Sequence, residues 1–366
     1  MRKAFINAKL LKDGKIQDGN FAIENGVFTE YIEGEKAVDL GGDTVIPGLI
    51  DIHTHGRCGY DFDDTTPEEL TELKKLYAKK GVTTVIPTLA SDEYGKMLLR
   101  VKEASELGFQ ALHIEGRYIN PAKKGAHAPE YLAPLDPNEV EEFADAAKDM
   151  HLHFSSAFEL DENGKFLDAI LSRGYTASLA HTTATYGEAI ELVKKGVTSF
   201  THLFNAMPPI HHRDGGAVVA ALMTDAYAEV ICDGYHLAPE TVKLIRTAKS
   251  PDRVILITDS IVAAGYEGPE RTFFSAGLEI FMRDGTARLS DGTIAGSTLE
   301  LWQGVRNYMT FTGADLPEAV ACATENPAHL LGLNNVGKIE NGYKADFLRI
   351  SDDLSIKEIY VEGKKI

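Results

Sequence analysis

Short apolar runs alternate with helical patterns through the central part of the chain. The apolar runs fall near residues 44–53, 82–89, 110–115, 151–158, 176–181, 197–202, 228–232 and 253–259. Amphipathic patterns typical of helices fall at about 67–80, 92–107, 136–149, 163–173, 185–195, 215–224, 239–249 and 297–312. Because uninterrupted apolar runs of this length are typical of buried parallel strands, about eight β-then-α units predict a closed (β/α)₈ TIM-like barrel rather than an open doubly wound sheet.

The two ends of the chain have a different pattern. Near the N-terminus, short segments of alternating apolar and polar residues are separated by Asp13-Gly14 and Asn25-Gly26, which are typical hairpin turns. The last residues of the chain show the same alternation. We therefore expect a small β-sandwich domain built from residues 1–46 and 336–366. Residues 47–335 between them should form the barrel, with an inserted hairpin region at 266–296.

Polar side chains follow five of the predicted strands at the point where each strand ends. They are His53, His55, Glu115, His181, His202 and Asp259. In a barrel of this class the carboxyl ends of the strands meet on one face, and the chemistry lies there. Residues two apart in a strand point to the same side, so the imidazoles of His53 and His55 can face one ion. A carboxylate and two imidazoles from nearby strands, Glu115, His181 and His202, predict a catalytic divalent-metal site with an open coordination position.

Each of these residues also has a purely structural interpretation. The His-x-His pair can cap a strand end, Glu115 can be a salt-bridge partner, and a lone histidine in a barrel can be a satisfied core residue. Asp259 can cap the segment that begins at Ser260. The set as a whole favours one metal-centred hydrolytic site, in which Asp259 takes and returns the proton of the attacking water.

Composition excludes several other classes of function. A formal net charge of −18 argues against a nucleic-acid surface and against binding to an anionic membrane. No apolar run approaches the roughly 18 residues that a membrane helix needs, and the basic start of the chain lacks the apolar region of a signal peptide. The three cysteines, Cys58, Cys232 and Cys322, are odd in number and widely spaced. They predict free thiols and a cytoplasmic protein.

One loop stands out as basic in this acidic chain. After His202 the sequence contains His211, His212 and Arg213 in a stretch rich in glycine and proline. A guanidinium group matches the oxygens of a phosphate, so this loop is a candidate for anion recognition. The segments 123–127 and 233–236 add polar loop groups to the same predicted face.

At this point the motifs resemble those of a known family, the N-acetylglucosamine-6-phosphate deacetylases of the metal-dependent amidohydrolase superfamily. The motifs are Pro47-Gly-Leu-Ile-Asp-Ile-His-Thr-His-Gly56, His113-Ile-Glu-Gly116, Lys123-Lys-Gly-Ala-His127, Thr201-His-Leu-Phe-Asn-Ala-Met-Pro208, Asp233-Gly-Tyr-His236, Thr258-Asp259 and Ala295-Gly-Ser297. They occur in the family's order, and the resemblance covers essentially the whole chain. The first motif marks only the superfamily, whereas the Lys-Lys-Gly-x-His motif and the Thr-His-Leu-Phe-Asn-Ala-Met motif are much narrower.

The resemblance implies a role for each matching residue. Glu115, His181 and His202 would bind the principal metal, His53 and His55 would belong to a second metal position, and Asp259 would be the catalytic acid/base. The substrate would be contacted by Ala126, His127, Asn205, Ala206, Arg213, His236, Ile294, Ala295 and Gly296, with Arg213 and His236 near the phosphate. The implied cofactor is one or two divalent ions per subunit, zinc first, with iron, manganese or cobalt as alternatives.

The resemblance also implies a homodimer, because in this family phosphate contacts can come from the neighbouring subunit. The implied reaction is hydrolysis of the acetamide of N-acetyl-D-glucosamine 6-phosphate. The alternatives are an amidohydrolase acting on another N-acylated amine or on a cyclic amide, and a non-catalytic barrel that serves as a binding module. One departure from the family is Arg117, which we expect either to pair with the metal carboxylate or to extend phosphate binding.

Overall fold

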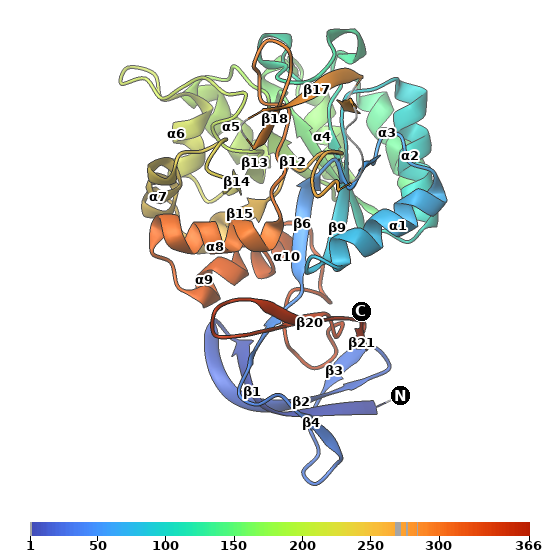
Figure 1. Ribbon diagram of the computed structural model, residues 1–366. Coiled ribbons are helices and arrows are strands. Elements are labelled where there is room, and N and C mark those ends of the chain that lie inside the picture. Colours follow the sequence, from blue (N-terminus) through green and yellow to red (C-terminus); the bar gives the residue numbers. More distant parts are fainter. Residues whose placement is uncertain (1, 268–271, 276, 284) are drawn as a thin grey trace.

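The main sheet of the protein is a parallel barrel with its helices on the outside (Figure 1). The computed structural model describes residues 2–267, 272–275, 277–283 and 285–366. The barrel strands are β6 (Leu49–Thr54), β9 (Val82–Leu89), β10 (Ala111–Glu115), β11 (His151–Ser156), β12 (Thr176–Leu179), β13 (Ser199–Phe200), β14 (Tyr227–Ile231) and β15 (Val254–Ile257). Each strand pairs with the next in parallel, and the last returns to the first through a parallel bridge between Thr54 and Ser260. The predicted fold class is confirmed.

The first eight helices lie close to the positions that the amphipathic patterns predict, and two more follow them. They are α1 (Pro67–Ala78), α2 (Tyr94–Glu106), α3 (Pro137–Ala147), α4 (Lys165–Ser172), α5 (Tyr186–Lys195), α6 (Gly216–Met223), α7 (Pro239–Ala248), α8 (Leu301–Thr312), α9 (Leu316–Ala321) and α10 (Glu325–Leu330). Short 3₁₀ turns occur at Pro121–Lys123, Pro129–Tyr131, Phe158–Leu160 and Pro251–Arg253. Thr66 and Thr185 begin α1 and α5 with capping boxes, in which the hydroxyl accepts from the backbone of Glu69 or Glu188.

The prediction of one continuous strand at residues 44–53 is wrong. The structure divides it into β5 (Thr44–Pro47), which belongs to the small sheet, and β6, which belongs to the barrel. The division falls at Gly48, where an added Cβ would lie 2.1 Å from the hydroxyl oxygen of Thr83. The backbone therefore passes so close to β9 at this position that only glycine fits without movement. A continuous apolar run concealed this change of sheet.

Both ends of the chain build the small sheet, as predicted. Its strands are β1 (Arg2–Lys12), β2 (Lys15–Glu24), β3 (Val27–Thr29), β4 (Ala37–Asp39), β5, β19 (Phe347–Ile350), β20 (Ile356–Val361) and β21 (Lys364–Lys365). The sheet rolls back on itself, because Val27 of β3 bridges Lys344, just before β19. Phe5, Phe21 and Phe347 fill its interior, and the ring of Phe347 stacks on Tyr360 at a centroid distance of 4.3 Å. This unit lies at the end of the barrel where β6 begins (Figure 1).

A three-stranded antiparallel sheet lies at the opposite end of the barrel (Figure 1). It consists of β16 (Phe273–Ser275), β17 (Leu278–Arg283) and β18 (Thr286–Arg288), and it confirms a hairpin region between 266 and 296, of which 268–271, 276 and 284 lie outside the described residues. A two-stranded hairpin, β7 (Gly56–Arg57) with β8 (Tyr60–Asp61), follows β6. Among the described residues, no helix has the length and apolar character needed to cross a membrane.

Candidate metal centre and active site

Three of the predicted site residues have an unusual backbone conformation. His181, His202 and Asp259 have φ values of 44°, 32° and 49°, and each lies two residues beyond the last residue of its strand. Residues other than glycine rarely adopt this left-handed conformation, which costs on the order of 1–3 kcal/mol and is concentrated at functional sites. The turn directs the three side chains over the open end of the barrel instead of along the sheet.

The carboxylate of Glu115 lies at the centre of the first group of donor atoms. Its Oε1 is 2.8 Å from Nε2 of His202 and 3.3 Å from Nε2 of His181. The two imidazole Nε2 atoms are 3.1 Å apart. Burial alone would raise the pKa of Glu115, but the charge of His53 and the hydrogen bonds from His181 and His202 lower it well below its ordinary value. Glu115 is therefore a buried carboxylate ion surrounded by imidazoles.

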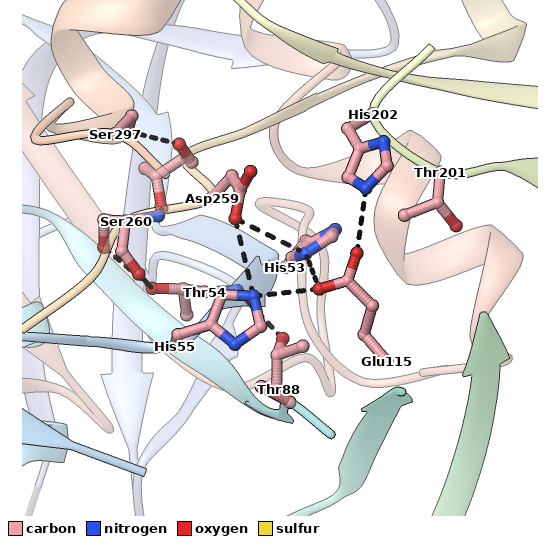
Figure 2. A network of polar contacts seen from close by, with 12 residues as sticks. His53, Thr54, His55, Thr88, Glu115, Thr201, His202, Asp259, Ser260 and Ser297 are labelled. Atoms are coloured by element: carbon pink, nitrogen blue, oxygen red, sulfur yellow. Dashed lines mark hydrogen bonds and ion pairs between the residues drawn. The ribbon is translucent and has the colours of Figure 1, made fainter. Parts of the chain in front are cut away.

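The other oxygen of Glu115 faces the second group of donor atoms (Figure 2). Its Oε2 lies 3.1 Å from Nε2 of His53 and 3.0 Å from Nε2 of His55. Oδ1 of Asp259 lies 3.6 Å and 3.4 Å from the same two nitrogens. The structure therefore brings all six predicted residues together, as two clusters that share one carboxylate: Glu115, His181 and His202 on one side, and His53, His55 and Asp259 on the other.

The donor atoms of the first cluster fit a divalent cation. Nδ1 of His181 lies 2.7 Å from the backbone oxygen of Lys123, a hydrogen bond that places the proton on Nδ1 and leaves the lone pair of Nε2 directed at the cluster. Two Nε2 atoms at about 2.0–2.1 Å from one tetrahedral ion would be separated by roughly 3.3 Å, close to the observed separation. Imidazole nitrogens and carboxylate oxygens are the ligands that catalytic zinc sites use. The cluster is therefore a candidate metal site.

Sequence reasoning did not identify Glu229, which lies directly beneath this centre. It is a fully buried carboxylate in the middle of β14, and its Oε2 is 2.9 Å from Nδ1 of His53. Burial alone would raise the pKa of Glu229, but its contacts with His153 and His53 lower it. The sequence does contain one signal for this residue, which is a charge inside the apolar run Tyr227-Ala-Glu-Val-Ile. A carboxylate is rarely buried without a partner, so its presence in a buried strand indicates that it is paired.

A pocket of about 570 Å³ opens above the two clusters. The predicted substrate residues that line it are Ala126, His127, Asn205, Ala206, His236, Ile294, Ala295 and Gly296. Lys123 and Lys124 also line it, so positive charge lies at the pocket of an acidic chain. Arg213 is not among the lining residues; its side chain is exposed, and Nη1 lies 2.7 Å from Nε2 of His212. One chain alone therefore brings together every predicted substrate contact except the arginine.

His127 is held as a neutral imidazole on the wall of this pocket. Burial and the charge of His181 lower the pKa of His127 to about 3. Its Nδ1 accepts hydrogen bonds from the backbone N–H of Ser91 at 3.3 Å and from the Ser91 hydroxyl at 2.9 Å. Because Nδ1 is the acceptor, the proton of the neutral ring belongs to Nε2. His127 therefore offers an N–H donor rather than a positive charge.

The structure corrects both expectations for Arg117. Its guanidinium pairs with Glu139 at 3.2 Å and lies over the ring of Tyr94, whereas the metal carboxylate Glu115 is paired with imidazoles. Arg117 does not line the pocket. Its φ of 58°, next to Gly116 at 150°, turns the side chain outward toward α2 and α3. Arg117 therefore links α2 and α3 in the helical layer and does not take part in the site.

A parallel barrel that gathers imidazoles and carboxylates at the carboxyl ends of its strands has the architecture of a metal-dependent hydrolase. The sequence matches the amidohydrolase family over residues 44–366. The chain is 31% identical to the N-acetylglucosamine-6-phosphate deacetylase of Bacillus subtilis (strain 168), over 95% of this chain and 94% of that protein. The chain belongs to the amidohydrolase family.

Two further comparisons cover nearly the full length of the chain. It is 29% identical to an N-acetylgalactosamine-6-phosphate deacetylase of Escherichia coli O157:H7, over 97% of this chain and 96% of that protein. A solved structure, a mutant N-acetyl-D-glucosamine-6-phosphate deacetylase from Mycobacterium smegmatis in complex with N-acetyl-D-glucosamine-6-phosphate, matches with a TM-score of 0.92 and 29% identity. That match covers 100% of this chain and 99% of the other.

Replacing Arg117 with alanine should lower stability and leave the metal centre intact. The variant loses a partly buried ion pair, so we expect the free energy of unfolding to fall by about 1–3 kcal/mol in urea titrations. Arg173→Ala is the matched control, because its pair with Glu141 is exposed and should contribute at most about 1 kcal/mol. Loss of bound metal from Arg117→Ala, with unchanged stability, would contradict the assignment.

Proposed function

We propose that this protein is an N-acetylglucosamine-6-phosphate deacetylase, which converts N-acetyl-D-glucosamine 6-phosphate and water to D-glucosamine 6-phosphate and acetate in amino-sugar catabolism and recycling. The proposal rests on the carboxylate of Glu115, which faces both donor clusters at the floor of a pocket. The names of the curated relatives support the same activity. So does the bound ligand of the structural neighbour.

The metal assignments follow the two clusters. Glu115, His181 and His202 would hold the principal ion, and His53 and His55 would contribute to a second position beside Asp259. Zinc suits these nitrogen and oxygen donors best, and iron, manganese and cobalt accept the same ligands. When bound, a divalent ion supplies Lewis-acid activation of the attacking water and of the amide carbonyl.

Asp259 would move the proton during the reaction. Burial alone would raise its pKa, but the charge of His53 and the hydrogen bond from His55 lower it, so the carboxylate is ionised before the reaction begins. An ionised carboxylate at the pocket floor can accept the proton of the attacking water. The same proton can then be delivered to the nitrogen of the departing amine, which restores the carboxylate and balances the reaction.

His127 would stabilise the negative charge that develops on the carbonyl oxygen. A neutral ring with its proton on Nε2 and its Nδ1 fixed by Ser91 is already oriented as a donor, and preorganised donors are worth about 3–4 kcal/mol in such sites. Asn205, Ala206 and the segment Ile294–Gly296 would line the sugar. These assignments rest on the positions of the residues in one pocket.

The phosphate would be held by His236 and by Arg213. His236 lines the pocket of its own chain, with Nδ1 held at 2.7 Å by Asp233. Arg213 lies on an exposed loop outside that pocket, which is the arrangement expected if each subunit of a homodimer supplies its arginine to the other. We propose such a homodimer in the cytoplasm, a location that suits the free cysteines.

A second candidate substrate is N-acetyl-D-galactosamine 6-phosphate. The name of the Escherichia coli relative favours it, because that protein is nearly as similar to the chain as the deacetylase of Bacillus subtilis. The two sugars differ only in the configuration of one hydroxyl group. A substrate comparison must therefore include both.

Replacing Asp259 with asparagine should abolish the chemistry and leave the principal metal bound. Loss of a positioned acid/base typically slows an enzyme by about 10²–10⁴-fold, measured here as acetate release from the phosphorylated sugar. Elemental analysis of the same sample should still find the principal ion. Asp315→Asn is the control, because it removes one carboxylate from the N-cap of α9, far from the pocket. Wild-type turnover in Asp259→Asn would exclude the acid/base role.

Removing the phosphate from the substrate should sharply lower kcat/KM. Each charge-assisted contact that is lost costs about 1.5–3 kcal/mol, so N-acetyl-D-glucosamine should react at least about tenfold to a hundredfold more slowly than its 6-phosphate. Rates of acetate release from both sugars and from N-acetyl-D-galactosamine 6-phosphate provide the comparison. Equal kcat/KM with and without phosphate would contradict the phosphate pocket, and faster release from the galactose sugar would favour the second candidate.

A mixed dimer tests whether Arg213 acts across the subunit interface. Arg213→Ala and Asp259→Asn should each be nearly inactive alone. If the arginine acts in the partner's site, a mixed dimer has one site with an intact Asp259 and an intact arginine from the other subunit. Co-expressed, differently tagged subunits should then regain up to about half of the wild-type activity per dimer.

The control for this experiment is a mixture of the two variants that is not allowed to exchange subunits. It should remain nearly inactive. No recovery in purified mixed dimers would place Arg213 in its own subunit's site, or outside the site altogether.

A further inference from the structure

The buried carboxylate of Glu229 lies behind the metal centre and contacts two of its residues. Its Oε2 is 2.9 Å from Nδ1 of His53 and 3.3 Å from the backbone nitrogen of His202. The side chain is completely buried within the barrel. Glu229 does not line the pocket.

The contact with His53 fixes the tautomer of that ring. A carboxylate that faces Nδ1 accepts its proton, so when the ring of His53 loses its second proton to bind an ion, the lone pair is on Nε2. Nε2 is the atom that faces Oε2 of Glu115 at 3.1 Å. Within the described part of the chain, Nδ1 of His55 has no hydrogen-bond partner. Of the two imidazoles in the second cluster, only His53 is therefore held in place from behind.

The rest of the fold pairs this buried charge only in part, because His153 faces its second oxygen at the distance of a loose ion pair. Oε1 of Glu229 has no hydrogen-bond partner among the described residues, and Nε2 of His153 lies 3.7 Å away from it. Burying an incompletely paired carboxylate costs several kcal/mol, and an apolar side chain would fill the same space in the barrel more favourably. The carboxylate is therefore explained better by the cluster above it than by packing.

We propose that Glu229 is a positioning residue that orients His53 and so determines how tightly the second metal position binds its ion. The inference deepens the proposed function, on which it rests through the two-cluster metal centre. A third carboxylate beneath Glu115 and Asp259 also adds negative charge where a second divalent ion would otherwise be repelled by the first.

The effect should be selective for the second position. His181 is fixed independently of Glu229, through the 2.7 Å contact between its Nδ1 and the backbone oxygen of Lys123. Glu229 reaches His202 only through its backbone nitrogen. The first cluster therefore keeps its donor atoms when Glu229 is replaced, whereas His53 loses the group that sets its tautomer.

The test is a zinc titration of metal-free protein by calorimetry, with elemental analysis of the gel-filtered product. Wild type should bind two ions per chain. Glu229→Leu should bind the second ion about 10–100-fold more weakly and the first with nearly unchanged affinity. Glu229→Gln keeps an acceptor for His53 but loses the charge, so its second-ion affinity should lie between the two. Asp346→Asn is the control, because Asp346 is a buried carboxylate in the distant small sheet unit.

Several results would overturn the inference. They are a wild-type chain that binds a single ion, an unchanged second-ion affinity in both Glu229 variants, or an equal loss of both ions. If Glu229→Leu does not fold, Glu229→Gln decides alone, and wild-type affinity in that variant overturns the inference. The readout does not involve substrate, so a wild-type chain that binds two ions and releases no acetate would contradict the proposed function and leave this inference standing.

Discussion

The arrangement of the site depends on one buried carboxylate that faces imidazoles on both sides. Glu115 directs one oxygen at His181 and His202 and the other at His53 and His55. A buried carboxylate requires such partners, and the imidazole nitrogens require a proton or a cation between them and the oxygen. This single constraint converts two groups of side chains from distant parts of the sequence into one centre.

The barrel satisfies this constraint because parallel strands deliver their carboxyl ends to one rim. Glu115 is the last residue of β10, and His181, His202 and Asp259 turn over the rim through left-handed backbone conformations. This backbone strain is tolerated because the strands beneath are fully buried and closed into a ring. The small sheet lies at the end of the barrel opposite β17 and β18 (Figure 1), whereas Ser275, Thr293 and Ile294, next to those strands, line the pocket.

Much of this could be predicted from the sequence, because it depends on local signals. Apolar runs located the barrel strands, and a histidine or carboxylate at the end of a run located each of the six cluster residues. Other features depend on contacts between residues far apart in the sequence, which no local pattern can predict. The change of sheet at Gly48 arises from the proximity of Thr83, and the orientation of Arg117 arises from Glu139 on a separate helix. Glu229 lies in the middle of β14, so a pattern of polar residues at strand ends does not include it.

We propose that the Glu115 carboxylate lies between two metal positions. Anomalous diffraction at the zinc edge, from crystals of the wild-type protein grown with zinc, tests it most directly. Two anomalous peaks are expected, each about 2.0–2.2 Å from a different oxygen of Glu115. One peak should lie among His181 and His202 and the other among His53 and His55. Peaks that do not contact Glu115, or no peak in its vicinity, would show that this carboxylate does not join two metal positions.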